Sequence, residues 1–299
     1  MIAARHGIFC IASALCLASV ASARQIDWFC LPNKINRVST GGLMDASFLF
    51  QLGVFKNGFI PKASNIADWS KHWETAQDSS YNTVEASFAN NLVVATSPPA
   101  SPFTVGAKAY VWGRGNGGEW ILFRNTAWTW PAEGNPMDFP LDWNAADTNE
   151  VILGEIPSTG IPFQMKSAAV LSYQAWRDVA LAGEPLHAPG DDPDQDGSSN
   201  ALEFVFGTSP VLAGSPTLTP LSIVDASDLF YQQITVPRLR DRLATVVVEV
   251  SGDLVTWQSG AAHTLEVSNS DTQLVVRDVV PTGPSNPRRF MRARVVVTP

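Results

Sequence analysis

The chain has 299 residues, of which 45% are hydrophobic and only 16% are charged, and its formal net charge at pH 7 is −8. The hydrophobic share excludes a disordered chain, and the acidic balance argues against general affinity for nucleic acid. The length leaves room for two domains with separate cores. Ten Trp, 21 Gly and 21 Pro are typical of a protein with many strands and turns, so we expect a mainly β fold.

The first 23 residues have the features of a secretory signal peptide. Arg5 and His6 give a polar start, residues 8–20 are apolar but short for a membrane span, and Ala21–Ala23 has the small-x-small pattern of a cleavage site. A buried N-terminal helix is the alternative. We expect cleavage after Ala23, a secreted or cell-surface protein, and no membrane span in the mature chain.

Cys30 is the one cysteine that remains after this cleavage, so the mature chain cannot form an internal disulfide. Its neighbours in the sequence are apolar, which favours a buried, unreactive thiol over a catalytic one. Whether Cys30 pairs between chains is left open.

Residues 24–162 are predicted to form an N-terminal β-rich domain with one short helix. Asn65 is a candidate N-cap for a helix over residues 66–76, and Trp69 and Trp73 would share its inner face. One helix against a mostly antiparallel sheet or small sandwich is the expected arrangement. Strand-like runs cover residues 47–53, 83–88, 92–96, 107–112, 119–124 and 151–156.

Three tryptophans of this domain are candidates for binding a glycan. Trp128 and Trp130 are two residues apart, so on a strand they project from one face, and we place Trp143 near them. Exposed indole rings could stack on a sugar ring, whereas buried rings would belong to the core. This prediction therefore depends on exposure.

Residues 163–210 are predicted to form a helical connector, and the Ser-, Thr-, Gly- and Pro-containing stretch 211–220 a linker. Apolar residues at spacings of three and four predict a helix over residues 166–182, which ends at Gly183. A second helix is expected over residues 201–206. Gly207 is its predicted C-cap.

Between these helices, residues 192–203 have an oxygen-bearing residue at each ligand position of a twelve-residue calcium loop. Aspartates occupy positions 1, 3 and 5, Gly197 allows the sharp turn at position 6, and Glu203 at position 12 can bind through both oxygens. A solvated acidic turn without metal is the alternative. The predicted ligands are Asp192, Asp194, Asp196, the carbonyl of Ser198, Asn200 through water, and Glu203.

The loop resembles the EF-hand-like calcium loops of dockerins and of bacterial thrombospondin type 3 repeats. The resemblance covers Asp192 to about Pro210 and implies calcium bound by the same residues. This chain departs from the pattern by having a single copy, a polar Ser199 where EF-hands place an apolar residue, and a first helix that ends well before the loop. These departures favour a rigid structural site between two domains over cohesin docking or calcium sensing.

Residues 221–299 are predicted to form a small β-sandwich of the fibronectin or immunoglobulin kind. The expected strands cover residues 230–236, 244–251, 264–267, 273–279 and 290–297.

The sequence thus favours a secreted, non-catalytic modular protein, stabilised by calcium, with a structural or binding role at the bacterial cell surface or outside the cell. The candidate partners are a polysaccharide or another surface protein. The alternative is a polysaccharide-acting enzyme or glycan-binding module with its site in the N-terminal domain. The enzyme would need two facing carboxylates, which no spacing in the sequence indicates, and there is no nucleophile elbow or HExxH motif.

Overall fold

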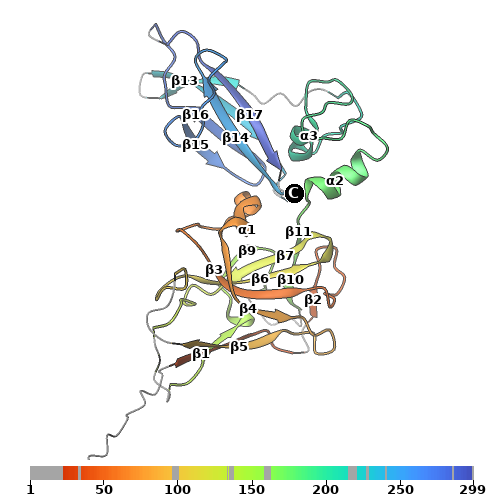
Figure 1. Cartoon of the computed structure of the whole chain (residues 1–299), viewed down its shortest axis with the longest axis vertical. Coiled ribbons are helices and arrows are strands. Elements are labelled where there is room, and N and C mark those ends of the chain that lie inside the picture. Colours follow the sequence, from red (N-terminus) through yellow and green to blue (C-terminus); the bar gives the residue numbers. More distant parts are fainter. Residues whose placement is uncertain are drawn as a thin grey trace, which may run out of the picture.

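The computed structural model describes residues 23–32, 35–95, 101–132, 134, 138–157, 163–214, 221–226, 229–239, 241–284 and 286–297. It shows two β-rich domains, with the connector lying beside the C-terminal one (Figure 1). The expectation of a mainly β fold is confirmed. The predicted signal peptide lies outside the described residues except for Ala23, where the first strand begins.

The N-terminal domain is built on a six-stranded sheet with the order β11-β7-β6-β3-β4, in which β9 also pairs with β7. A three-stranded sheet, β5-β1-β8, packs on one face, and the short helices η1 and α1 pack on the other. The elements are β1 (Ala23–Phe29), β2 (Ile35–Arg37), β3 (Leu49–Phe55), η1 (Ala63–Asp68), α1 (Trp69–His72), β4 (Trp73–Ser80), β5 (Ala89–Ala95), β6 (Ala109–Gly115), η2 (Asn116–Gly118), β7 (Glu119–Arg124), β8 (Leu141–Asn144), η3 (Ala145–Asp147), β9 (Glu150–Leu153), β10 (Phe163–Lys166) and β11 (Ala168–Ala169).

The central strands are buried on both faces. In β6, Ala109 and Val111 belong to the core beneath the three-stranded sheet, and Tyr110 and Trp112 belong to the core beneath η1 and α1. Successive side chains of a strand point to opposite faces. A strand covered on both faces is therefore continuously apolar, which explains why these runs alternate poorly in the sequence.

The predicted helix over residues 66–76 is shorter than expected. Helical structure runs from Ala63 to His72, and Trp73 is already the first residue of β4, which pairs with β3. Trp69 and Trp73 nevertheless pack in the same core, with ring centroids 5.8 and 5.5 Å from that of Trp112. The predicted strand at residues 83–88 is mostly a turn.

The predicted helix over residues 166–182 also starts late. β10 pairs with β2 and β11 pairs with β7, so the N-terminal domain continues past residue 162. Helix α2 covers only Tyr173–Ala180, and its N-cap Ser172 accepts a hydrogen bond from the N–H of Ala175. Pairing with existing sheets thus prevails over the helical spacing of the apolar residues.

The C-terminal domain is a sandwich of a four-stranded sheet, β12-β13-β16-β15, and a two-stranded sheet, β14-β17. Its core contains Ile234, Val236, Val248 and Val276. Two predicted strands, 244–251 and 290–297, have the bounds observed for β14 and β17, whereas β12 was not predicted. The elements of this part of the chain are α3 (Asn200–Phe206), β12 (Leu221–Ala226), β13 (Leu229–Pro237), β14 (Ala244–Ser251), β15 (Thr264–Asn269), β16 (Gln273–Asp278) and β17 (Phe290–Val297).

The connector is packed into the C-terminal sandwich. Tyr173 of α2 and Phe204 and Val205 of α3 form a small core against the ends of β14 and β17, and Phe206 contacts both this core and the core between the sheets. The N–H of Leu171 also donates to the carbonyl of Asp241. The connector and the C-terminal domain therefore share apolar core. None of the helices in the described part of the chain has the length and apolar character needed to cross a membrane.

Candidate metal centre

The three loop aspartates lie together. One carboxylate oxygen from each of Asp192, Asp194 and Asp196 lies within 4.8 Å of the corresponding oxygens of the other two. Each residue also accepts a hydrogen bond from a loop N–H, namely that of Gly197, Asp196 and Ser198 respectively. These bonds fix the side chains and leave Oδ1 of Asp192 and Oδ2 of Asp194 buried without a hydrogen-bond partner.

Helix α3 supplies two more buried oxygens of this kind. Asn200 and Glu203 are both 0% exposed. Oδ1 of Asn200 and Oε2 of Glu203 have no partner, whereas Oε1 of Glu203 lies 3.4 Å from the hydroxyl of Thr208. Buried polar atoms normally have partners, and unpartnered carboxylate and amide oxygens are of the kind that a hard cation takes as ligands.

The pKa of the Glu203 carboxyl is raised by its surroundings in the candidate site. Burial raises its pKa to about 7, and repulsion from Asp194, Asp196 and Asp192 adds to the rise. A cation among these groups would oppose both effects, because it offsets the lost hydration and the mutual repulsion. The donor set, made up of carboxylate and amide oxygens, is the one that calcium prefers.

The loop is held in shape from both sides. Gly197 has φ of +93°, a conformation that L side chains rarely adopt. The side-chain amide of Asn200 donates to the carbonyls of Leu186 and Ala188, and its backbone N–H donates to that of Asp191. The segment before the loop is therefore attached to the first turn of α3, where helix N–H groups need acceptors.

Helix α3 connects the candidate metal centre to the sandwich. Nε of Arg242 donates to the carbonyl of Phe204, and the guanidinium lies over the ring of Phe204. The N–H of Leu239 donates to the carbonyl of Val205. The helix that bears Glu203 is thus bonded to the segment that leads into β14.

The sequence-predicted metal residues are brought together only in part by these contacts. The three aspartates form a cluster, and Glu203 is close enough for their charges to raise its pKa. Ser198 is buried, with its N–H bonded to Asp196. The role of the Asn200 amide in holding residues 186–191 was missed, because no local pattern relates an amide to carbonyls more than ten residues earlier.

The structure corrects the interpretation of the three tryptophans as a glycan platform. Trp128, Trp130 and Trp143 are only 4, 4 and 5% exposed and belong to the N-terminal core. Trp128 stacks on Trp143 with ring centroids 5.7 Å apart. Rings buried in this way cannot stack on a sugar.

Carboxylates of the N-terminal domain are engaged in structural contacts. Glu119 accepts hydrogen bonds from Ser39 and Ser167, which connect β7 to neighbouring segments. Glu150 pairs with the buried Arg124. Glu119 and Glu150, which a polysaccharide-acting enzyme could have used as acid or base, are therefore engaged in structural contacts.

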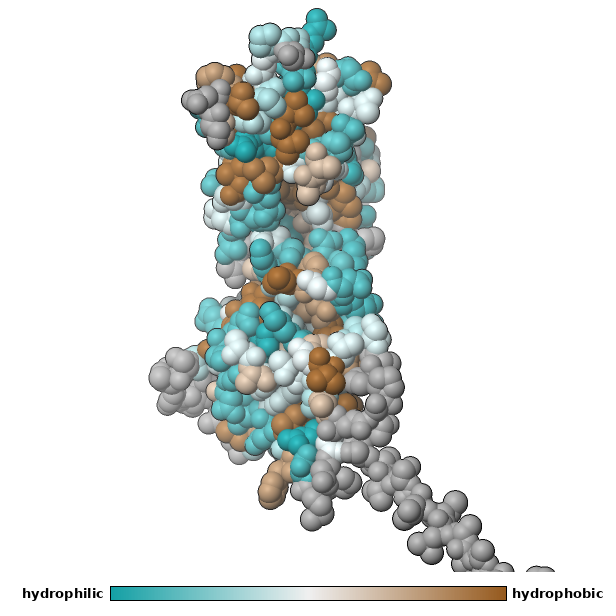
Figure 2. All heavy atoms as spheres, turned by 90° about the vertical axis from the view of Figure 1, so that its left-hand side faces the viewer, coloured by the Kyte–Doolittle hydropathy of each residue, from teal (hydrophilic) through white to brown (hydrophobic). Residues whose placement is uncertain are grey.

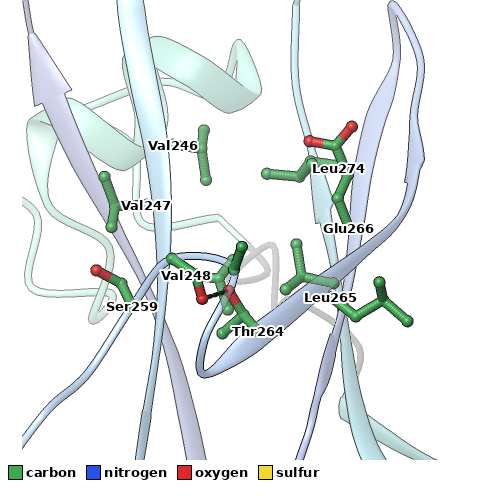
Figure 3. Close-up of a pocket in the computed structure, with 11 residues that line it drawn as sticks. Val246, Val247, Val248, Ser259, Thr264, Leu265, Glu266 and Leu274 are labelled. Carbon is green, nitrogen blue, oxygen red and sulfur yellow. Dashed lines mark hydrogen bonds between the residues drawn. The ribbon is translucent and has the colours of Figure 1, made fainter.

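A cavity of about 610 Å³ lies in the C-terminal sandwich between β14 and the β15–β16 pair. Figure 3 shows its lining, which is made mainly of valine and leucine side chains, with Glu266 as the carboxylate. The dashed contact is the hydrogen bond from the hydroxyl of Thr264 to the carbonyl of Gly260. This lining suits apolar contact and offers no pair of acid and base groups.

Comparisons with known proteins identify no relative. No protein-family model matches the chain, and no curated protein or solved structure shows significant similarity to it.

Proposed function

We propose that the protein is a secreted, non-catalytic modular protein that binds one calcium ion at residues 192–203 and has a structural or binding role at the bacterial cell surface or outside the cell. The observation that carries the proposal is the set of four buried, unpartnered oxygens from Asp192, Asp194, Asn200 and Glu203. Secretion is supported by the signal-like pattern of the first 23 residues.

Calcium would act on this protein by stabilising the packing of the connector. In the proposed site, Asp192, Asp194, Asp196 and Glu203 hold the ion, which neutralises carboxylates that otherwise repel one another. Since α3 is bonded to Leu239 and Arg242, order in the loop favours the docked position of the helix on the C-terminal sandwich.

Titration calorimetry on protein stripped of metal by a chelator tests the proposal. We expect saturable binding of one calcium ion per chain, with a dissociation constant on the order of 10⁻⁵ to 10⁻³ M, because a single unpaired loop in a calcium-rich medium need not bind tightly. Glu203→Gln should abolish measurable binding, because it removes the most buried carboxylate of the set. Glu184→Gln removes a charge outside the loop and should leave the affinity unchanged.

Absence of saturable heat with the wild-type protein up to about ten millimolar calcium would show that the loop is an acidic turn without metal. Equal loss of binding in Glu203→Gln and Glu184→Gln would show that only the overall charge matters.

A further inference from the structure

The C-terminal sandwich has strand edges that are open. Its second sheet contains only β14 and β17. Within the described residues, the backbone pairing on the other edge of β14 is a single bridge, between Val250 and Gln258. An open edge presents unpaired N–H and C=O groups, to which another strand can be added.

The free peptide groups of β14 are those of Val246 and Val248. Val250 exchanges both backbone hydrogen bonds with Gln258, on the side away from β17. Peptide groups alternate sides along an antiparallel strand, so those of Val246 and Val248 point to the same open side. No backbone hydrogen bond occupies them within the part of the chain that the structure describes.

This open edge borders the cavity of Figure 3. Val246, Val248, Leu274 and Val276 line the cavity, and all four pack in or against the core of the sandwich. A strand beside β14 would therefore find hydrogen-bond partners along its backbone and an apolar cavity of about 610 Å³ for its side chains. An extended segment with apolar side chains at every second residue fits both requirements.

The same chain exposes such a segment in β12. This strand pairs only with β13 among the described residues, so its other edge is open. Leu221 and Ile223, two residues apart, are 55 and 66% exposed, and the neighbouring Phe230 of β13 is 53% exposed. Leu221 is paired with the buried Ile234, so it lies on the face of the sheet that turns toward the core.

These apolar side chains lie on an exposed part of the sandwich. β13 begins at the end of the sandwich that is farthest from the N-terminal domain (Figure 1). Figure 2 shows hydrophobic side chains at the surface of this upper domain. An exposed apolar strand at an open edge is a template for pairing with another chain.

We propose that β12 of one molecule adds to the open edge of β14 in a second copy of this chain, with Leu221 and Ile223 entering the cavity beside β14. A donor strand and an acceptor edge at different places on one molecule make a heterologous, head-to-tail contact. Calcium binding plays no part in this contact.

Sedimentation or light scattering on the full chain, from about 1 to about 100 µM, tests the contact. We expect the mass per particle to rise with concentration above the mass of one chain. Ile223→Lys should weaken the association at least tenfold by placing a charge in the cavity. Ser222→Lys is its matched control on the opposite face of β12, and it should associate like the wild type.

A second matched pair of variants tests the acceptor edge of β14. Ala261 lines the cavity and Ala262 does not, and both are exposed, so bulky residues are tolerated at either position. Ala261→Trp should prevent association by filling the cavity, whereas Ala262→Trp should not.

Mixing the variants gives the decisive result. Ile223→Lys keeps an intact acceptor and Ala261→Trp keeps an intact donor, so each alone should be monomeric and an equimolar mixture should form a one-to-one dimer. A wild-type protein that stays monomeric throughout the range would overturn the proposal. So would a mixture that stays monomeric, or association that survives in both variants.

Discussion

Asn200 and Glu203 are equally buried, yet their side chains have different partners. Glu203 offers a carboxylate to the candidate metal centre, whereas Asn200 uses its amide N–H groups on the carbonyls of Leu186 and Ala188. Calorimetric titration should show that Glu203→Ala weakens calcium binding more than Asn200→Ala, because two direct carboxylate oxygens are lost.

The order of the two variants should reverse for the stability of the metal-free protein. Asn200→Ala removes both side-chain hydrogen bonds, which leaves the carbonyl of Leu186 without this partner, whereas the carbonyl of Ala188 still accepts from the N–H of Asp191. The substitution should lower the free energy of unfolding by about 1–3 kcal/mol. Glu203→Ala removes a carboxylate that is repelled by its neighbours, so chemical denaturation in chelator should show a smaller loss. A larger loss for Glu203→Ala would mean that its contact with Thr208 dominates.

Cys30 is a residue whose reactivity follows from burial. It is 1% exposed, and desolvation raises the pKa of its thiol from 9.0 to about 11. The native protein should therefore not react with a disulfide reagent at about pH 8, where an exposed thiol reacts readily, and reaction should appear on unfolding.

The raised pKa of Cys30 determines the direction in which pH changes the free energy of unfolding. The folded state retains the Cys30 proton that the unfolded state loses, so the free energy of unfolding should fall as pH rises from 9.0 toward about 11. Cys30→Ala should make this fall shallower in denaturant titrations. If the free energy of unfolding falls with pH equally steeply in Cys30→Ala, other groups such as Tyr81 are responsible for the fall.

At the scale of elements, Gly207 ends α3 in a left-handed conformation, with φ of +79°. A Cβ there would lie 2.6 Å from the side chain of Leu239, so both backbone strain and steric overlap oppose a substitution. Gly207→Ala should lower the free energy of unfolding by about 1–2 kcal/mol. Gly190→Ala, where a Cβ has no neighbour within 4 Å, should change it little in the same measurement.

The sequence predicts elements well where local pattern and tertiary pairing agree. Strands β14 and β17 and the cap at Gly207 have the predicted bounds, because turns and apolar runs mark them directly. The predicted helix over residues 166–182 fails in its first part, since β10 and β11 pair with strands far away in the chain. β1 was not predicted, although Ile26, Trp28 and Cys30 alternate as the buried face of a strand should.

The candidate site is more predictable than the fold around it. Asp192, Asp194 and Asp196 are spaced within one loop, so the sequence alone places these three carboxylates together. The burial of Glu203 and the link from α3 to Arg242 depend on the C-terminal sandwich, which no local spacing reveals. The burial of the three tryptophans could not be predicted for the same reason, because exposure is a property of the packed domain.

At the scale of the whole molecule, the shared core of connector and sandwich defines where calcium should act. Calcium bound at the proposed site would stabilise the folded state by about 2.7 kcal/mol at a hundredfold excess over the dissociation constant. In scanning calorimetry, calcium should raise the unfolding temperature of the C-terminal part and leave that of the N-terminal domain nearly unchanged.

Limited proteolysis locates this effect. Without calcium, new cuts should appear within residues 184–214, where Asn200 of α3 is bonded to the segment before the loop. A digestion pattern that is identical with and without chelator would show that the connector stays docked through its apolar contacts alone.

The parallel pairing of β1 with β8 determines when the N-terminal domain can complete its fold during synthesis. Trp28 lies beside Trp143 in this pair, so the first strand of the domain cannot find one of its neighbours until most of the domain has been synthesised. The parallel pair of β2 and β10 joins segments that are even farther apart in the sequence, with Ile35 opposite Phe163. Folding that depends on such distant contacts is slow. The N-terminal domain should therefore remain open while the chain is being made and close only after residue 163 has emerged.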